Sequence, residues 1–179
     1  DVLSMVMQSD MDKIRMTLEE VDRTQFDASV RAIISAKRIY ILGVRSAASL
    51  AGFLGFYFNL IFDNVVLVST TSASEMFEQI LRVGKGDVVI GISFPRYSRR
   101  TVKAMQFARD RGATVIAVSD SLASPLASFA THTLMAKSDM ASFVDSLVAP
   151  LSLINALIVA IGRETNEDLS QTFETLEQI

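Results

Sequence analysis

The sequence contains no cysteine and a single histidine, His132, among its 179 residues. Without cysteine the chain can form no disulfide framework, thiolate nucleophile or thiolate metal ligand. One histidine is too few for the zinc sites that are built from several imidazoles. We therefore expect no metal and no cofactor. Any chemistry must depend on hydroxyl, carboxylate, guanidinium or backbone groups.

Proline and glycine are also scarce, with three and eight residues, while half of the chain is hydrophobic and 21% is charged. This composition is typical of one ordered domain. The formal net charge of −3 argues against nucleic-acid binding through the overall field of the protein. The N-terminus lacks the basic region, apolar run and cleavage site of a signal peptide, so we expect a cytoplasmic protein.

Two runs have no charged side chain, Ser46 to Phe62 and Ser146 to Gly162. Each is near the lower limit of about 17 residues for a membrane-spanning helix, and each contains serine and asparagine. Neither has basic residues at one flank only. We interpret both as buried helices that are covered by a sheet and by a partner subunit. The expected partner is thus a second copy, in a homo-oligomer (dimer or tetramer), and not a membrane.

The most informative stretch runs from Asp87 to Thr101 and reads DVVIGISFPRYSRRT. Val88 to Ile92 form an apolar run that is typical of a strand buried on both faces. Ser98 is a favourable N-cap for the amphipathic segment that follows. A strand, a loop with hydroxyl groups and a helix N-terminus together favour an anion, because the helix dipole and the unpaired N–H groups attract negative charge.

Four cations follow in this region without an acidic residue among them: Arg96, Arg99, Arg100 and Lys103. Cations in the first turn of a helix oppose its dipole by about 0.3–1 kcal/mol each. A bound dianion would reverse that cost for the cations that face it. The alternative is a capped helix whose arginines point into solvent.

The segment from Ser93 to Thr101 resembles the phosphate loop of sugar isomerase (SIS) domains, S-x-S-G-x-T, and in particular its form in MurR/RpiR-type bacterial transcription regulators. Ser93 takes the place of the first serine and Ser98 that of the threonine, whereas Pro95 replaces the second serine and Arg96 the glycine. These departures remove a hydroxyl group and add a charge. The resemblance implies a phosphate-binding set from this loop: Ser93, Arg96, Tyr97, Ser98 and Thr101.

A second loop, Gly43 to Ser46, resembles the G-x-G-x-S turn of SIS domains, with Arg45 at the second glycine. Arg45 and Ser46 are then expected to contact the ligand from across the crevice. The alternative is an ordinary turn in which Ser46 is the N-cap of the next helix.

Five apolar runs alternate with helical or loop segments: Arg38–Leu42, Val65–Val68, Val88–Ile92, Thr114–Val118 and Thr133–Ala136. This alternation predicts an α/β protein whose parallel sheet has helices on both faces. We expect the three-layer α/β/α sandwich of an SIS domain, with a five-stranded parallel sheet in the flavodoxin-like order 2-1-3-4-5. Ligands bind such sheets at the carboxyl ends of the strands, near the switch point between strands 1 and 3.

Residues 1–37 are expected to form a helical lead-in, and residues 38–179 the SIS phosphosugar-binding domain. In the regulators such a lead-in follows a helix-turn-helix module, which we expect to be absent from this chain. The resemblance implies an effector-sensing domain that binds a phosphorylated sugar and controls DNA binding by that separate module. DNA would be contacted only through the module.

A phosphosugar aldose–ketose isomerase is the alternative function, and it requires a carboxylate base near C1 and C2 of the sugar. We expect Glu75 to be engaged in a capping box with Ser72 and Asp120 in a turn. Asp145 would lie inside a helix from Ala141 to about Arg163, before a final helix from Glu164 to Ile179. The sequence therefore predicts no catalytic residue. A dimerisation module without a ligand is hard to reconcile with the four cations.

Overall fold

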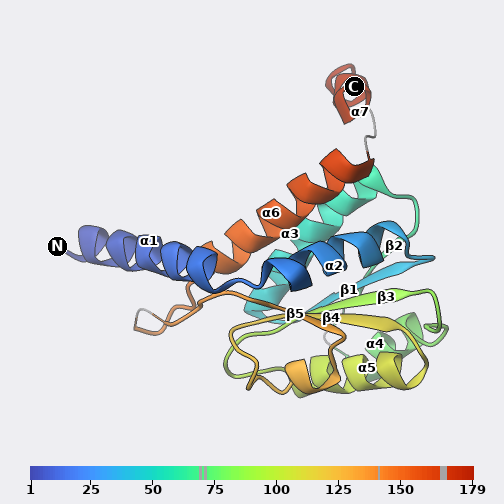
Figure 1. Cartoon of the computed structure of the whole chain (residues 1–179), viewed down its shortest axis with the longest axis horizontal. Helices are drawn as coiled ribbons and strands as arrows, with labels where there is room; N and C mark the ends of the chain where they lie inside the picture. Colours follow the sequence, from blue (N-terminus) through green and yellow to red (C-terminus); the bar gives the residue numbers. More distant parts are fainter. Residues whose placement is uncertain (69, 71, 141, 166–168) are drawn as a thin grey trace.

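The computed structural model describes residues 1–68, 70, 72–140, 142–165 and 169–179. Within these residues it has one five-stranded parallel sheet in the order β2-β1-β3-β4-β5 (Figure 1). The strands are β1 (Ile39–Gly43), β2 (Val65–Val68), β3 (Val88–Ile92), β4 (Thr114–Ser119) and β5 (His132–Met135). The predicted α/β fold and strand order are confirmed, and each strand lies within one residue of its expected bounds.

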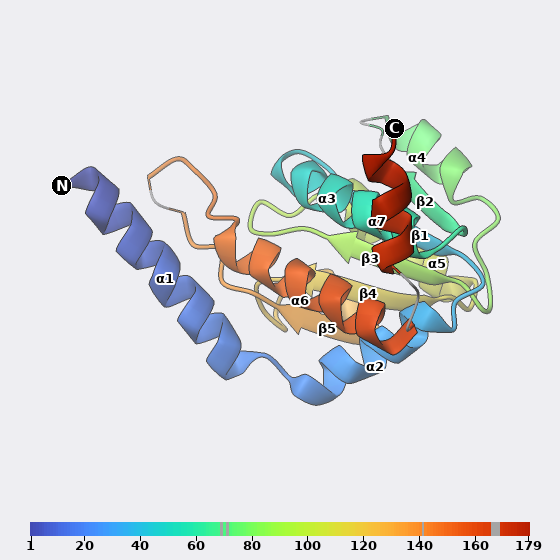
Figure 2. The same cartoon turned by 90° about the horizontal axis from the view of Figure 1, so that it is seen from above.

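Helices cover both faces of the sheet, which gives the three predicted layers (Figures 1 and 2). One layer contains α2 (Arg23–Ile34), α3 (Ser46–Ile61) and α6 (Val148–Thr165), and the other contains α4 (Ala73–Gln79) and α5 (Arg99–Asp110). Successive side chains of a strand point to opposite faces, so Ile39 and Ile41 join the core under α3 and α6, whereas Tyr40 and Leu42 join the core under α4 and α5.

The lead-in consists of two helices, α1 (Val2–Glu20) and α2, with the break at Asp22. The Asp22 carboxylate caps α2 by accepting the N–H groups of Thr24 and Gln25 at 2.9 and 3.1 Å. α1 extends beyond the sheet as an arm (Figure 2). Ser146 fastens it by donating its hydroxyl to the Asp10 carboxylate at 2.7 Å.

The predicted bounds of the last two helices are wrong. α6 begins at Val148, and residues 142–147 are not helical, while Ala141 lies outside the described residues. Pro150 gives the reason, because proline is accepted in the first turn of a helix and disrupts its interior. α6 continues to Thr165, residues 166–168 lie outside the described part of the chain, and α7 spans Leu169–Glu177.

α6 is the one helix of the described residues that is long and apolar enough to cross a membrane. It packs against α1, α2 and α3, and it buries Leu153, Leu157 and Ile161 in the core over the sheet. These contacts are those of a core helix, as the sequence predicts.

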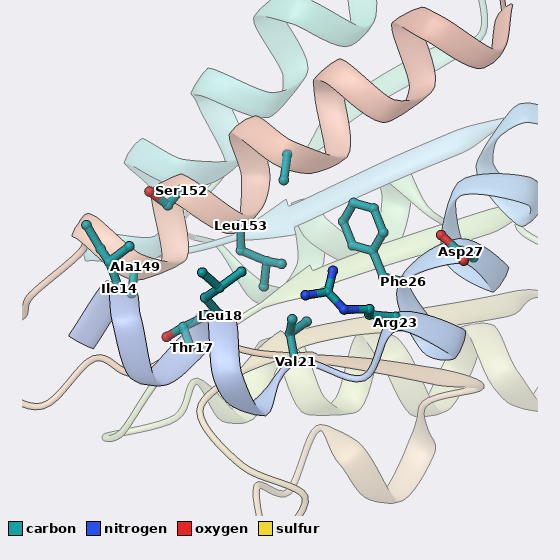
Figure 3. A pocket seen from close by; sticks show the side chains of 11 residues that line it. Ile14, Thr17, Leu18, Val21, Arg23, Phe26, Asp27, Ala149, Ser152 and Leu153 are labelled. Carbon is teal, nitrogen blue, oxygen red and sulfur yellow. The ribbon is translucent and has the colours of Figure 1, made fainter. Parts of the chain in front are cut away.

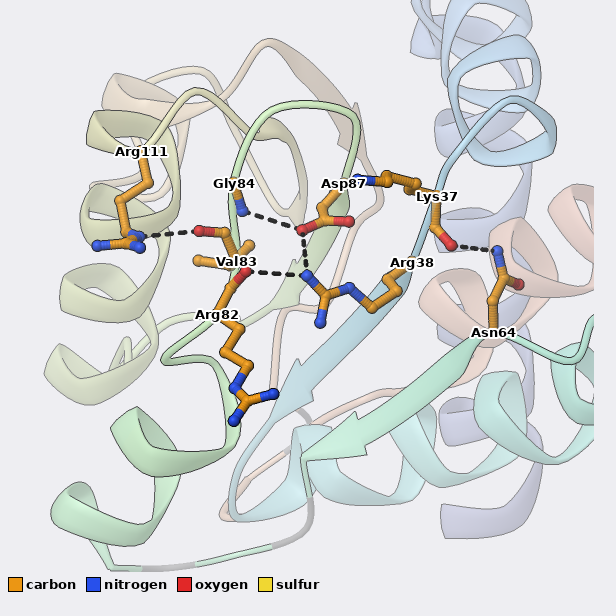
Figure 4. Close-up of polar contacts among 8 residues, drawn as sticks. All are labelled: Lys37, Arg38, Asn64, Arg82, Val83, Gly84, Asp87 and Arg111. Atoms are coloured by element: carbon orange, nitrogen blue, oxygen red, sulfur yellow. Dashed lines mark hydrogen bonds and ion pairs between the residues drawn. The ribbon is translucent and has the colours of Figure 1, made fainter.

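A polar cluster fixes the amino ends of β1 and β3 (Figure 4). Asp87, which is 2% exposed, accepts from the Arg38 guanidinium at 3.4 Å and from the Gly84 N–H at 2.9 Å. Arg38 also donates to the Arg82 carbonyl at 2.9 Å. These bonds close the turn that enters β3, at the edge of the sheet opposite to the carboxyl ends of the strands.

The side chain of Met105, from α5, occupies the space beside Gly91 of β3. A Cβ atom at Gly91 would lie 2.3 Å from Sδ and 2.9 Å from Cγ of Met105, which is fully buried. Glycine therefore leaves room for the Met105 side chain between α5 and β3. The helix N-terminus is thereby held beside Ser93, the first residue after β3.

We expect Gly91→Ala to destabilise the domain by about 1–3 kcal/mol, because the added methyl group overpacks a closed core. Gly52→Ala is the matched control, since a Cβ there meets no described atom within 4 Å and alanine gains about 0.5–1 kcal/mol over glycine inside a helix. Urea denaturation measures both. Equal stability of Gly91→Ala and the wild type would contradict the close approach.

Candidate functional site

Two helix N-termini meet at the carboxyl ends of β1 and β3. α3 begins at Ser46, shortly after β1, and α5 begins at Arg99, after the loop that leaves β3. The two strands are paired neighbours, so the loops that follow them lie side by side. The first N–H groups of each helix have no acceptor within the helix, and both dipoles direct their positive ends to this crevice. The sequence predicts the ligand site at this place.

Two adjoining cavities open at the crevice. The first, here called the Ser93 cavity, has a volume of about 270 Å³ and a polar wall of Arg45, Ser46, Ser93, Arg96, Ser98 and Asp145. The second, the Arg100 cavity, has a volume of about 400 Å³ and includes Arg45, Tyr97, Ser98, Arg99 and Arg100. Val44, Arg45 and Ser98 belong to both and form the shared wall. Five of the seven predicted ligand residues thus line the Ser93 cavity.

Ser93 and Ser98 hold the loop between β3 and α5 in shape. Ser93 is 4% exposed, and its Oγ accepts the N–H of Ser98 at 3.0 Å. Ser98 is the predicted N-cap of α5, and its Oγ accepts the N–H of Thr101 at 3.2 Å. Neither hydroxyl donates to another described residue, so each keeps its hydrogen for an acceptor in the cavity.

Arg45 and Arg96 have positive φ angles of 57° and 62°. A residue with a side chain seldom adopts this region, which costs roughly 1–2 kcal/mol. Both arginines stand where the resembling motifs have glycine, and the backbone conformation explains that glycine. The two loops therefore keep a glycine-like shape while they carry guanidinium groups to the cavity wall. Backbone strain of this kind is typical of ligand-binding loops.

In this structure the Tyr97 hydroxyl, a predicted ligand group, has a hydrogen-bond partner within the protein. It donates to the carboxylate of Asp120, which lies in the turn after β4. Burial and then the hydrogen bond to Asp120 raise the pKa of Tyr97 to about 12, so the phenol is protonated at neutral pH. Its ring lines the Arg100 cavity, but its hydroxyl is already engaged.

Thr101 lines neither cavity, and its side chain is fully buried. It belongs to the inner stripe of α5 with Ala104, Met105 and Ala108, which the helical spacing of these residues explains. Its Oγ1 has no hydrogen-bond partner among the described residues. The contribution of Thr101 to the loop is its N–H, which holds Ser98.

Asp145 is a site residue that the sequence analysis considered as a base and set aside, because it expected Asp145 to lie inside a helix. It lies in the non-helical segment before α6, lines the Ser93 cavity, and accepts the hydroxyl of Ser46 at 2.9 Å. Ser46 is therefore not an N-cap; Arg45 occupies that position without a side-chain bond to the helix. The signal that could have revealed Asp145 is Pro150, because a proline in the first turn places the helix start after Asp145.

The other predicted structural roles are largely as expected. Ser72 caps α4 by accepting the N–H of Glu75 at 3.5 Å. In a capping box the Glu75 side chain would accept the Ser72 N–H directly. Here the Thr70 hydroxyl lies between them, because it accepts the Ser72 N–H and donates to Glu75. His132 contacts Gln25 at 3.0 Å, and burial together with Arg31 lowers its pKa. Within the described residues no cluster of acidic residues and histidine could hold a metal ion.

A family model of the SIS domain matches residues 32–160. The chain is 24% identical over 182 residues to an uncharacterized helix-turn-helix-type transcriptional regulator of Caldanaerobacter subterraneus. That alignment covers 99% of this chain and 64% of the regulator, so the chain spans less than two thirds of this relative's length.

Solved structures agree with the family match. The sugar isomerase domain of an RpiR transcription factor from Sphaerobacter thermophilus superposes with a TM-score of 0.91 at 26% identity, over 98% of both chains. The Vibrio vulnificus NanR protein, complexed with ManNAc-6P, superposes with a TM-score of 0.85 at 20% identity, over 99% of this chain and 69% of that chain. Solved phosphosugar isomerases share the fold at lower identity.

Proposed function

This chain belongs to the SIS domain family, and we propose that it is the effector-sensing domain of a cytoplasmic transcription regulator. It binds a phosphorylated sugar and so controls DNA binding by a separate helix-turn-helix module. The observation that carries the proposal is the crevice where two helix N-termini meet Ser93, Ser98 and the guanidinium groups of Arg45 and Arg96. The likeness to regulators over almost the whole chain supports it.

A phosphate monoester fits the chemistry of this crevice. It is a dianion near neutral pH, with three oxygens that accept hydrogen bonds. Backbone N–H groups, two serine hydroxyls and arginine side chains are its usual donors. Arg99 and Arg100 add positive charge at the Arg100 cavity, whereas Lys103 lines neither cavity. Arg99 and Arg100 oppose the dipole of α5 in the empty protein, but both would attract a bound dianion.

The attachment of α1 supports a sensing role. Asp145 lines the Ser93 cavity, and the next residue, Ser146, holds Asp10 of α1. A ligand that moves Asp145 would therefore also move the adjacent Ser146, which is hydrogen-bonded to α1. α1 is the segment through which we expect occupancy to pass to the helix-turn-helix module.

Phosphorylated sugars should raise the melting temperature of the domain, and their unphosphorylated parents should not. A suitable first panel pairs ManNAc-6P and glucose 6-phosphate with N-acetylmannosamine and glucose. A ligand at 100 times its Kd adds about 2.7 kcal/mol, or roughly 5–10 °C for a domain of this size. Thermal-shift measurements compare the members of each pair. Equal shifts within a pair would contradict a phosphate site.

Ser98→Asp separates the cap from the ligand contact. Aspartate is as good an N-cap as serine, so the variant should melt within a few degrees of the wild type, but its carboxylate should abolish the thermal shift by repelling the phosphate. Ser72→Asp is the matched control, because Ser72 caps α4 and lines neither cavity. Unchanged ligand binding by Ser98→Asp would refute this placement of the site.

A phosphosugar isomerase is the second candidate, and Asp145 is the observation that favours it. A carboxylate on the wall of a sugar cavity could act as the base that removes a proton from C2. Ring opening also needs an acid, and the residues that line the two cavities include no histidine and no other carboxylate. We therefore propose that the domain binds its ligand without converting it.

Incubation with aldose and ketose phosphates in D₂O should leave C1 and C2 of the sugar unlabelled. An enediol intermediate exchanges hydrogen with solvent even when turnover is slow, so NMR of the recovered sugar is a sensitive assay. Protein-dependent deuterium at C2 that disappears in Asp145→Asn would replace the sensor proposal with an isomerase.

We also propose that the domain is a homo-oligomer. α1 has an apolar stripe at helical spacing, made of Leu3, Met7, Met11, Ile14 and Leu18, whose exposed fractions range from 39% to 69%. At the C-terminal half of α1 an apolar cavity of about 430 Å³ lies between α1, α2 and α6 (Figure 3). The stripe is nearly symmetric about Met11. An antiparallel α1 of a second copy would thus bring its Leu3 and Met7 to this cavity.

The sequence assigned the subunit contact to α3 and α6, and each of these helices also keeps an exposed apolar side chain, Phe56 and Val159. The exposed faces of α3 and α6 would extend an interface that begins at α1. A tetramer could use both the contact through α1 and the contact through α3 and α6.

Light scattering at tens of micromolar should therefore give a dimer or a larger oligomer. Met11→Glu should shift the equilibrium towards the monomer, because it places two like charges at the proposed two-fold axis. Met5→Glu is the matched control, since Met5 is also exposed but lies on nearly the opposite side of the helix at 100° per residue. A monomeric wild type would contradict the proposal, and an equal effect of both variants would contradict the use of this stripe.

A further inference from the structure

We propose that Asp145 selects for the sugar part of the ligand. Its carboxylate accepts a hydrogen bond from a hydroxyl or N–H group of the sugar, and it opposes the binding of phosphate alone. The inference rests on the phosphosugar site proposed above, and it adds the residue that distinguishes a sugar phosphate from other phosphate-bearing anions.

A carboxylate is unexpected in a cavity that is otherwise suited to an anion. The other polar side chains of the Ser93 cavity are hydroxyl groups and two guanidinium groups, Arg45 and Arg96. A negative charge among them repels a phosphate dianion, more strongly in a partly enclosed site than in water. For ligand binding, Asp145 is favourable only if the ligand brings a donor that compensates for this repulsion.

The contacts of Asp145 leave it able to accept such a donor. Its Oδ2 accepts the Ser46 hydroxyl at 2.9 Å, which fixes the carboxylate against the start of α3. Within the described chain its Oδ1 accepts no hydrogen bond, and no lysine or arginine forms an ion pair with it. A carboxylate has about four acceptor positions, so most of its capacity remains available. Arg45 and Arg96 are likewise not neutralised by Asp145 and remain available to a phosphate.

The cavity wall has a phosphate-binding part and a separate acidic part, and these match the phosphate end and the sugar end of the ligand. The phosphate-binding groups lie on the loops after β1 and β3, whereas Asp145 lies on the separate segment between β5 and α6. A ligand held by its phosphate at Ser93 and Ser98 would direct its carbon chain into the same cavity, where Asp145 forms the only acidic part of the described wall. Hydroxyl groups donate well to a carboxylate, and such charge-assisted bonds are stronger than neutral ones.

Isothermal titration calorimetry with three probes tests the inference. The probes are inorganic phosphate, methyl phosphate, and the sugar phosphate that gives the largest thermal shift, each titrated into wild type, Asp145→Asn and Asp145→Ala. Both variants should bind the first two probes about three- to tenfold more tightly, because a repulsive charge is gone. The preference for the sugar phosphate over methyl phosphate should fall roughly tenfold or more in Asp145→Ala. The fall should be smaller in Asp145→Asn, whose amide oxygen still accepts a hydrogen bond.

Asp139→Asn is the control for a general change of charge, because Asp139 is exposed on the same connection and lines neither cavity. It should leave the preference for the sugar phosphate unchanged. If Asp145→Ala changes the affinities for methyl phosphate and the sugar phosphate by the same factor, Asp145 is only a background charge, and the inference fails while the phosphate site stands. If the wild type binds none of the three probes, the phosphosugar site itself fails.

Discussion

The parallel pairing of β1 with β3 is the constraint on which the site depends. Gly43, the last residue of β1, is in register with Ile92, the last residue of β3, so both strands end at the same level. The chain reaches this pairing by crossing over through β2 at the outer edge of the sheet, and the loops after β1 and β3 diverge to helices on opposite faces. A crevice between these loops follows from the topology alone. Met105 of α5 packs against Gly91 of β3, which helps to hold this helix over the strand that leads to the crevice.

Electrostatics explains why this crevice carries features that would otherwise be unfavourable. Arg99 and Arg100 lie in the first turn of α5, where a cation opposes the helix dipole, and Arg45 and Arg96 have positive φ angles. Each feature costs free energy in the empty protein. A bound dianion would turn the cost of the cations into a gain, and the contacts of Arg45 and Arg96 with it would offset the backbone strain. Backbone strain and unfavourable charge placement of this kind are common at binding sites. Asp145 differs from these groups because its charge is negative and repels phosphate. For that reason it distinguishes ligands by their uncharged sugar part.

The features that could be predicted from the sequence are those that depend on local patterns of residues. Buried strands appear as apolar runs, Ser98 is recognisable as a cap because it precedes an amphipathic segment, and the two ligand loops follow from the order of the elements. Contacts between residues distant in the chain were not predicted: Ser46 meets Asp145 across 99 positions, and Tyr97 meets Asp120 across 23. Thr101 and the start of α6 are different, since the helical spacing of Ala104, Met105 and Ala108 and the position of Pro150 indicate them in the sequence.

The segment between β5 and α6 links the chemistry of the cavity to the arm. Asp145 and Ser146 are successive residues outside any helix, and their side chains reach different partners. Asp145 accordingly contacts Ser46 at the cavity, while Ser146 contacts Asp10 on α1. Fold alone does not separate a sensor from an isomerase, because both use the same framework. A direct connection from the ligand wall to a projecting helix is useful to a sensor, since a change at the cavity must leave the domain to have an effect. An isomerase gains nothing from it, because its reaction is complete within the cavity.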